Sequence, residues 1–144
     1  MEKTSKSDSP LVGFSTGFRD LDNITLGLQE GDLILVAGRP SMGKTAFALS
    51  MAANFIQNGL PVLFFSMEMS NRSIMYRLLS IISKVDLKKL QQVKDLTEDD
   101  HRKIEEAASI LNKSKLFIDD TSGLTPSEIL SRARRLKREH PELA

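Results

Sequence analysis

The chain has 144 residues, and its 20 Lys and Arg against 19 Asp and Glu leave a net charge of +1. This length suits one ordinary domain, and the balanced charge provides no general basic field for nucleic acid or an anionic membrane. The absence of cysteine excludes disulfides, zinc-thiolate sites and thiol catalysis. The longest apolar run, Leu60 to Phe65, is too short to span a bilayer, and the polar start lacks a signal peptide. We therefore expect a soluble, cytoplasmic protein.

The first half of the chain has the pattern of alternating strands and helices. Residues 1–12 begin with a polar, aperiodic stretch and are predicted to be a linker or disordered tail. Leu33 to Ala37 is an apolar run that leads into a glycine-containing turn, which predicts a buried strand. A helix is predicted over 46–57 and a second buried strand over 62–65. Together these segments predict a βαβ unit and an α/β fold.

The second half continues this alternation. Ser70 is a predicted helix cap before a helix over 71–84, and Thr97 is a second cap, followed by three acids at the positive end of another helix. Leu116 to Ile118 predicts a short strand, and Thr125 to Glu128 has the spacing of a capping box. The alternation runs to the last residue, so we expect Ala144 to interrupt a larger fold.

One segment carries a specific chemical signal. Gly38 to Thr45 matches the phosphate-loop pattern G-x-x-x-x-G-K-[ST], between a predicted strand and a predicted helix. Such a loop directs backbone N–H groups toward phosphate oxygens, and we expect Gly43 and Gly38 to permit the necessary backbone conformation and close approach. The candidate nucleotide-binding residues are Gly38, Arg39, Pro40, Ser41, Met42, Gly43, Lys44 and Thr45.

The roles within this loop follow from the chemistry of the side chains. The Lys44 ammonium supplies positive charge at the β and γ phosphates, and the Thr45 hydroxyl is a candidate Mg²⁺ ligand. The loop therefore predicts a nucleoside triphosphate together with Mg²⁺, and the resemblance described below implies that this triphosphate is ATP. Glu68 follows the second predicted strand, at the edge where ligands bind in parallel sheets, and it is a candidate for orienting or deprotonating the attacking water. Spacing alone leaves open the alternative of a solvated Glu that precedes a helix.

Four short segments follow one another along the chain: Thr16-Gly-Phe-x-x-Leu-Asp22, Thr25-x-Gly-Leu-x-x-Gly-Asp32, Arg39-Pro-Ser-Met-Gly-Lys-Thr45 and Ser66-Met-Glu-Met-Ser70. In this order they resemble DnaB-type replicative helicases. The last two segments distinguish this family from other phosphate-loop proteins, whereas Gly38 does not, since some family members have Ala there. The resemblance runs from about Val12 to the chain end.

This resemblance implies a RecA-like ATPase domain over residues 13–144, with a mostly parallel sheet and flanking helices. It also implies a ring-shaped homohexamer that encircles single-stranded DNA and translocates 5′ to 3′ with ATP, with primase and a helicase loader as partners. The resemblance also implies that Lys44 and Glu68 are catalytic residues and that Thr45 contacts the metal ion. The family's Walker B aspartate, DNA-facing loops and arginine finger are expected beyond Ala144, so this chain alone should be weak or inactive.

Two charged features have alternative interpretations. Asp119 and Asp120 end an apolar run and could form a Walker B motif, but we interpret them as loop acids and turn caps. A basic cluster lies in the last predicted helix, either as a solvated face or as a surface for DNA phosphates or a partner subunit. The cluster consists of Arg132, Arg134, Arg135, Lys137 and Arg138.

Two alternative functions remain from the sequence. One is a RecA-like recombination-type ATPase, which shares this core without unwinding DNA. The other is a non-catalytic module that holds a nucleotide to stabilise an assembly, which the missing Walker B and finger residues would suit.

Overall fold

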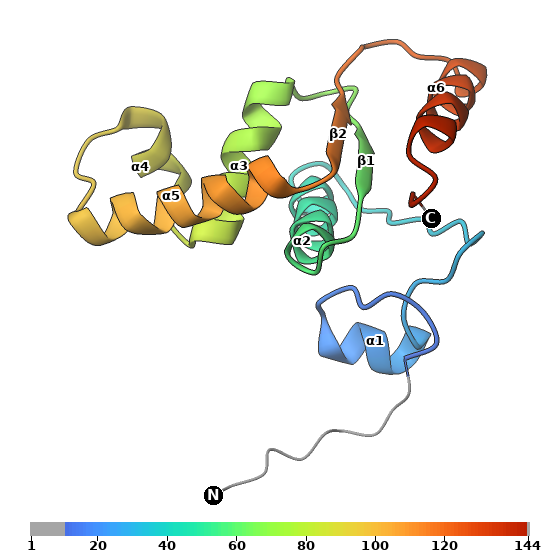
Figure 1. Ribbon diagram of the computed structural model, residues 1–144, viewed down its shortest axis with the longest axis horizontal. Coiled ribbons are helices and arrows are strands. Elements are labelled where there is room, and N and C mark those ends of the chain that lie inside the picture. Colours follow the sequence, from blue (N-terminus) through green and yellow to red (C-terminus); the bar gives the residue numbers. More distant parts are fainter. Residues whose placement is uncertain (1–10, 144) are drawn as a thin grey trace, which may run out of the picture. The chain divides into compact units, whose positions relative to one another are not determined.

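The computed structural model describes residues 11–143, which fall into two compact units that divide between Val36 and Ala37 (Figure 1). The predicted tail over 1–12 therefore lies almost entirely outside the described residues. The elements are α1 (Arg19–Thr25), α2 (Lys44–Gln57), β1 (Val62–Phe65), α3 (Asn71–Ser83), α4 (Leu87–Gln92), α5 (Glu98–Lys113), β2 (Leu116–Asp119) and α6 (Pro126–Glu139).

The first unit is organised around the buried carboxylate of Asp22 in α1. It accepts hydrogen bonds from the Ser15 hydroxyl (2.6 Å), the Thr16 hydroxyl (2.7 Å) and the Thr16 backbone N–H (2.9 Å). Burial disfavours the charged carboxylate, but these hydrogen bonds outweigh that effect and hold the pKa of Asp22 below its ordinary value. The Thr16 to Asp22 segment therefore has a structural role, closing the turn that precedes α1.

The sheet of the second unit consists of two parallel strands, β1 and β2. Val62 pairs with Leu116 and Phe65 with Asp119, and the connection between the strands contains α3, α4 and α5. Figure 1 shows the green and orange arrows side by side. The predicted strands over 62–65 and 116–118 are therefore correct. Because the strands are parallel, their carboxyl ends lie at the same edge of the sheet.

The predicted strand over Leu33 to Ala37 is not formed. These residues have no strand assignment, and Leu33 and Leu35 are 86% and 85% exposed. An apolar run becomes a strand only when neighbouring strands accept its backbone hydrogen bonds, and β1 pairs with β2 instead. The expected βαβ unit is therefore wrong in its first strand, and the observed parallel pair is β1 with β2.

Local capping signals define most helix starts in the second unit. Ser70 caps α3 by accepting from the Ser73 N–H. Thr97 and Thr125 each form a capping box with the residue three positions later, Asp100 and Glu128, which confirms the predicted helix starts. The short helices α1 and α4 were not predicted.

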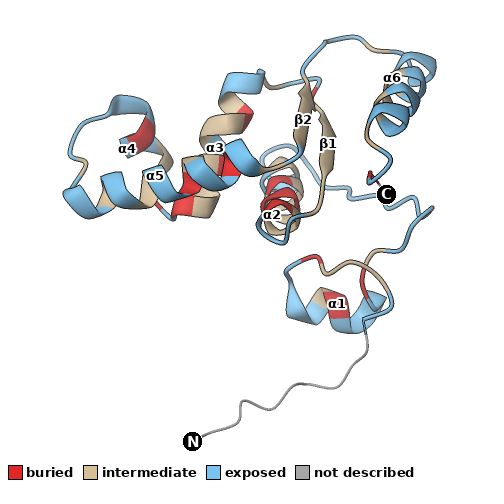
Figure 2. Ribbon diagram, viewed as in Figure 1, coloured by how far each residue is buried: buried red, intermediate tan, exposed pale blue. Residues whose placement is uncertain are grey.

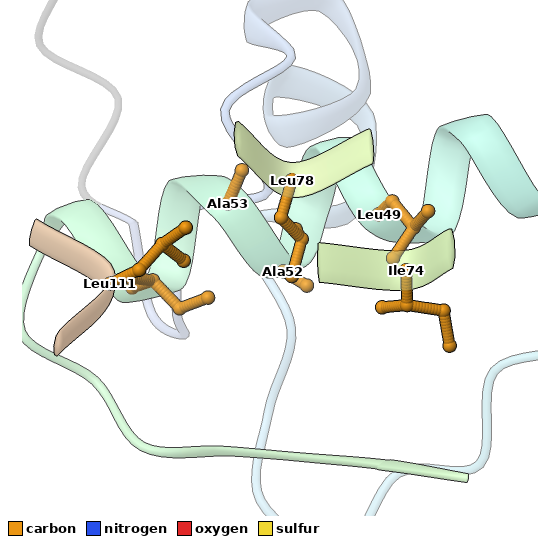
Figure 3. Close-up of a cluster of buried hydrophobic side chains, with 7 residues drawn as sticks. Leu49, Ala52, Ala53, Ile74, Leu78 and Leu111 are labelled. Carbon is orange, nitrogen blue, oxygen red and sulfur yellow. The ribbon is translucent and has the colours of Figure 1, made fainter. Parts of the chain in front are cut away.

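The core of the second unit lies where α2, α3 and α5 meet one face of the sheet. Leu49, Ile74 and Leu78 are completely buried, and the apolar side chains on one face of both strands pack against this cluster. Figure 3 shows that the cluster draws side chains from all three helices, and Figure 2 shows the buried stretches along them. The labelled residues are Leu49, Ala52, Ala53, Ile74, Leu78 and Leu111.

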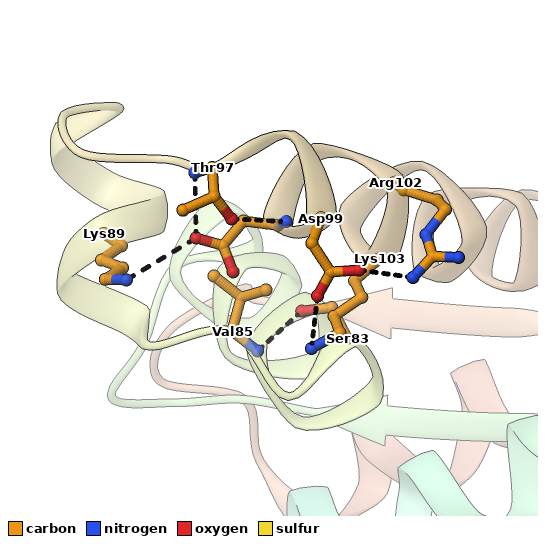
Figure 4. A network of polar contacts seen from close by, with 8 residues as sticks. Ser83, Val85, Lys89, Thr97, Asp99, Arg102 and Lys103 are labelled. Atoms are coloured by element: carbon orange, nitrogen blue, oxygen red, sulfur yellow. Dashed lines mark hydrogen bonds and ion pairs between the residues drawn. The ribbon is translucent and has the colours of Figure 1, made fainter.

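A network of polar contacts surrounds the start of α5 (Figure 4). Asp100, part of the capping box, lies 3.6 Å from the Lys89 ammonium on α4. Asp99 forms ion pairs with Arg102 and Lys103 within its own helix. These ion pairs lie at the surface, so solvent screens them and their contribution to stability is small.

Truncating a buried core residue should destabilise the second unit. Leu78→Ala removes a fully buried side chain from α3, and we expect the free energy of unfolding to fall by roughly 2–5 kcal/mol. Leu130→Ala on α6 is the control, because that side chain is 50% exposed and should cost less than about 0.5 kcal/mol. Urea unfolding followed by circular dichroism measures both, and equal losses would contradict the assigned core.

Candidate functional site

The phosphate-loop segment forms a compact turn in front of α2. The Met42 N–H donates to the Arg39 carbonyl (3.2 Å), and α2 begins at Lys44 with Gly43 as its N-cap. The aliphatic part of the Lys44 side chain lies close to Gly38, at the opposite end of the loop. Gly38 and Lys44 therefore bracket a turn built from Arg39, Pro40, Ser41 and Met42.

The two glycines of the motif differ in what they contribute. Gly43 has a φ of 88°, in the left-handed region that favours glycine. Gly38 lies outside that region, and a Cβ there would stand 3.4 Å from Lys44 Cγ, an ordinary contact. The expected backbone requirement for glycine is thus found at Gly43 and not at Gly38, whereas the expected close approach of the Gly38 backbone to phosphate stays a prediction.

The start of α2 leaves backbone donors unsatisfied. The first intrahelical bond of α2 runs from the Phe47 N–H to the Gly43 carbonyl (2.9 Å), so the N–H groups of Lys44, Thr45 and Ala46 have no acceptor within the helix. Gly43 provides no side-chain cap, whereas α3, α4, α5 and α6 each begin with a capping hydroxyl or carboxylate. The first turn of α2 also contains no acidic residue, so its N-terminal partial charge is not neutralised locally.

The side chains of the loop are accessible to solvent. Met42 is 74% exposed and Lys44 is exposed, while Thr45 is half-buried. Within the described residues, no hydrogen bond or ion pair engages the Lys44 ammonium. An uncapped helix start beside such an ammonium is a combination that binds anions, phosphate in particular.

Glu68 lies in the loop that connects β1 to α3. The buried Ser66 hydroxyl organises this loop by donating to the Met69 carbonyl (2.8 Å) and accepting from the Met69 N–H (3.2 Å). Glu68 is exposed, and in the described part of the chain its carboxylate has neither a hydrogen bond nor an ion pair with Lys44 or another residue. The structure thus places Glu68 at the carboxyl end of the sheet, with its carboxylate open to solvent.

Asp119 and Asp120 have defined partners at the end of β2. Asp119 accepts from Arg132 of α6 (2.6 Å) and from the Thr121 N–H (3.0 Å), while Asp120 accepts from the Asn71 N–H at the start of α3 (2.7 Å). Asp119 is the last residue of β2 rather than a loop acid, and its carboxylate caps the turn at Thr121, whereas Asp120 lies in the loop after β2, as predicted. Sequence reasoning missed the partners Arg132 and Asn71, because neither contact follows a local spacing rule.

The basic cluster of α6 is divided between structural contacts and solvent. Besides the bond of Arg132 to Asp119, the Lys137 ammonium donates to the carbonyls of Pro141 (2.9 Å) and Leu143. Arg134, Arg135 and Arg138 are exposed. Arg132 contacts Asp119, and the ring of His140 contacts that of Phe117. Phe65, Phe117 and Leu136 line a groove between this segment and the sheet face opposite the core. The cluster is thus in part an anchor for α6.

Among the described residues no group of three or more His, Cys, Asp or Glu side chains is arranged to hold a metal ion. None of the described helices combines the length and apolar character that crossing a membrane requires.

A sequence model of one family, described as the DnaB-like helicase C terminal domain, matches residues 13–144. The chain belongs to this family. The replicative DNA helicase DnaB of Pasteurella multocida is 46% identical over 148 residues, covering 100% of this chain and 32% of that protein. The replicative DNA helicase DnaB of Haemophilus influenzae is 45% identical, and the match covers 96% of this chain and 30% of that protein. The chain thus spans about a third of the length of these relatives.

Solved structures of DnaB-like helicases agree with this assignment. A DnaB-like replicative helicase described with its primase interactions superimposes with a TM-score of 0.86 at 33% identity, over 95% of this chain and 33% of that one. The ATPase domain of G40P gives the same TM-score and identity, and the superposition covers 95% of this chain and 49% of that one. The fold is therefore that of the DnaB-like ATPase domain, RecA-like in class, and the described residues contribute a small parallel sheet with flanking helices.

The left-handed conformation at the start of α2 should make Gly43 intolerant of a side chain. Gly43→Ala is expected to reduce the free energy of unfolding by about 1 kcal/mol, because a Cβ disfavours this backbone region while meeting no neighbouring atom. Gly38→Ala is the matched control and should be close to neutral. Urea unfolding of the two variants tests this, and a larger loss for Gly38→Ala would contradict the described loop.

The contacts of Asp119 predict a specific titration. Hydrogen bonding from the Thr121 side chain, and then from Arg132, lowers the pKa of Asp119 from 3.8 to about 2. The stabilisation linked to this carboxylate is therefore complete above about pH 4 and is lost as the pH falls toward 2. We expect Arg132→Ala to raise this pKa when carboxyl ¹³C shifts are followed by NMR. Asp99, which pairs with Lys103 and Arg102, should titrate unchanged, and an unmoved Asp119 would refute the assigned contact.

Proposed function

We propose that this chain is the ATP-binding part of a ring-shaped replicative DNA helicase, which couples ATP hydrolysis to 5′ to 3′ translocation on single-stranded DNA and duplex unwinding. The observation that carries the proposal is the Gly38 to Thr45 loop before the uncapped N-terminus of α2, in a chain of the DnaB-like family. The DnaB names of the relatives favour a helicase over a recombination-type ATPase or a non-catalytic assembly module.

The donor set at the start of α2 fits a triphosphate. The unsatisfied N–H groups of the first turn, the helix dipole and the exposed Lys44 ammonium all favour an anion at the same place. In this proposal the Lys44 ammonium contacts the negatively charged β and γ phosphates. The turn from Gly38 to Gly43 surrounds the phosphates with its backbone. The side chains of Arg39, Pro40, Ser41 and Met42 belong to the wall of this cradle.

Two further residues complete the proposed site. The Thr45 hydroxyl is the proposed Mg²⁺ ligand of this chain, and bound Mg²⁺ would supply positive charge to the phosphate oxygens. Glu68 is the proposed general base, since its exposed carboxylate can accept a proton from the attacking water or orient that water. The Lys44 ammonium then offsets negative charge that develops on the phosphate oxygens during hydrolysis.

The assembly follows from the same proposal. We assign the chain to a cytoplasmic homohexamer whose DNA contacts involve mostly other segments of the protein. Primase is a proposed partner, supported by the similar DnaB-like helicase structure that was described together with its interactions with primase. A helicase loader is a second proposed partner.

Nucleotide binding is tested with a fluorescent ATP analogue and Mg²⁺. Lys44→Ala should weaken binding by about tenfold or more, because it removes a charge-assisted contact with phosphate. Lys113→Ala, at an exposed lysine near the end of α5, is the matched control and should bind as the parent does. Equal affinity of the Lys44→Ala variant and the parent would falsify the assigned phosphate site.

The role of Glu68 is tested by phosphate release. Glu68→Gln should leave the affinity for the analogue within about twofold of the parent, since the carboxylate acts on water rather than on the phosphates, and should abolish any turnover that the parent shows. Turnover that survives Glu68→Gln would assign the general base to another group.

A further inference from the structure

Two consecutive residues at the end of β2 hold both ends of the loop that carries Glu68. At the first end, the Ser66 N–H donates to the Asp119 carbonyl (2.9 Å), which extends the parallel ladder by one bond. At the second end, the Asn71 N–H donates to the Asp120 carboxylate (2.7 Å). The residues between these two bonds, 67–70, therefore lie in a loop whose ends are both fixed to β2.

The two attachments differ in their chemistry. The bond to Asp119 uses a backbone carbonyl, which any residue could supply, whereas the bond to Asp120 needs a side-chain acceptor of suitable length. Ser70 already accepts the Ser73 N–H, so it leaves the first amide of α3 for another acceptor. A carboxylate suits this place because it is a charge-assisted acceptor and also meets the positive end of the helix dipole.

Inside the loop, a second layer of contacts restricts the backbone. The Ser66 hydroxyl binds both the carbonyl and the N–H of Met69, and the Met69 side chain packs against the apolar core. Glu68 therefore stands exposed between a residue held by Ser66 contacts and a helix start held by Asp120. Across the described part of the chain, its own carboxylate makes no polar contact that could fix its position.

From this arrangement we propose that Asp120 is a positioning residue for Glu68. It fixes the first amide of α3 to the end of β2 and so maintains the loop in the conformation that presents the Glu68 carboxylate at the carboxyl edge of the sheet. This inference rests on the proposed function for the role of Glu68, but the attachment of the loop is a property of the chain itself. Asp120 touches neither the nucleotide nor the water in this proposal.

The attachment is tested by amide hydrogen exchange measured by NMR. Asp120→Ala should increase the exchange rate of the Asn71 amide by about tenfold, the factor expected for losing a hydrogen bond to a charged acceptor. Asp120→Asn retains an acceptor oxygen and should recover most of the protection. The Asp100 amide, held by Thr97 in α5, is the internal reference and should not change. Unchanged exchange at Asn71 in Asp120→Ala overturns the proposal.

The effect on the reaction is tested by steady-state ATP hydrolysis with the same variants in the assembled helicase of the proposed function, because the chain alone is expected to be weak or inactive. Asp120→Ala should lower kcat by about tenfold and leave the KM for ATP within about twofold, with Asp120→Asn recovering most of the rate. Thr97→Ala is the matched control, because it removes a helix cap of similar worth from α5 without touching the loop. An equal fall of kcat in Thr97→Ala overturns the proposal, since it assigns the effect to general stability.

The failure of the proposed function has a different signature. If Glu68→Gln leaves turnover unchanged, Glu68 is not the general base, and Asp120 then has no positioning role in catalysis. The exchange of the Asn71 amide then still decides whether Asp120 holds the loop. If Glu68→Gln abolishes turnover while Asp120→Ala leaves kcat unchanged, the proposed function stands and the positioning role is wrong.

Discussion

Parallel pairing between β1 and β2 is the constraint on which the second unit depends. The register of Val62 with Leu116 and Phe65 with Asp119 places one apolar face of both strands against the helical core. The same register brings the ends of the two strands together, so that the loop after β1 and the turn after β2 can exchange hydrogen bonds. The packing that stabilises the unit thus also sets the position of the chemically active loop.

Helix α2 combines a well-anchored body with an incompletely satisfied start. Its middle and end are buried through Leu49, Ala52, Ala53 and Ile56, whereas its first turn has neither a side-chain cap nor an acidic residue. Glycine in place of a capping side chain costs only a few tenths of a kcal/mol, which burial of the apolar face readily offsets. The core contacts therefore allow the helix to retain exposed N–H donors, the property on which the proposed phosphate site relies.

Local signals in the sequence predicted most of the elements. Among what was missed, α4 begins at a local cap, Asp86, whereas the partners of Asp119 and Asp120 are non-local. Ser70, Thr97 and Thr125 mark helix starts because a capping side chain acts within three residues. The strand predicted at Leu33 to Ala37 failed because an apolar run cannot specify its own partner. The motif indicated Gly43, Lys44 and Thr45, but it could not show that Gly43 and Ser41 adopt left-handed backbone geometry while Gly38 does not. The attachment of Asp120 to Asn71 spans 49 positions, and no spacing rule predicts it.

That separation in sequence has a consequence for folding. Asp120 can reach Asn71 only after β2 has docked beside β1, and closing so long a loop carries an entropic cost that the earlier, local hydrogen bonds of α3 avoid. The body of α3 can thus form early, while its first amide is secured late. In the reverse direction, fraying of β2 releases this amide before the helix unwinds. Order in the Glu68 loop is therefore a sensitive indicator of whether the sheet is intact, and local opening at β2 should appear there first.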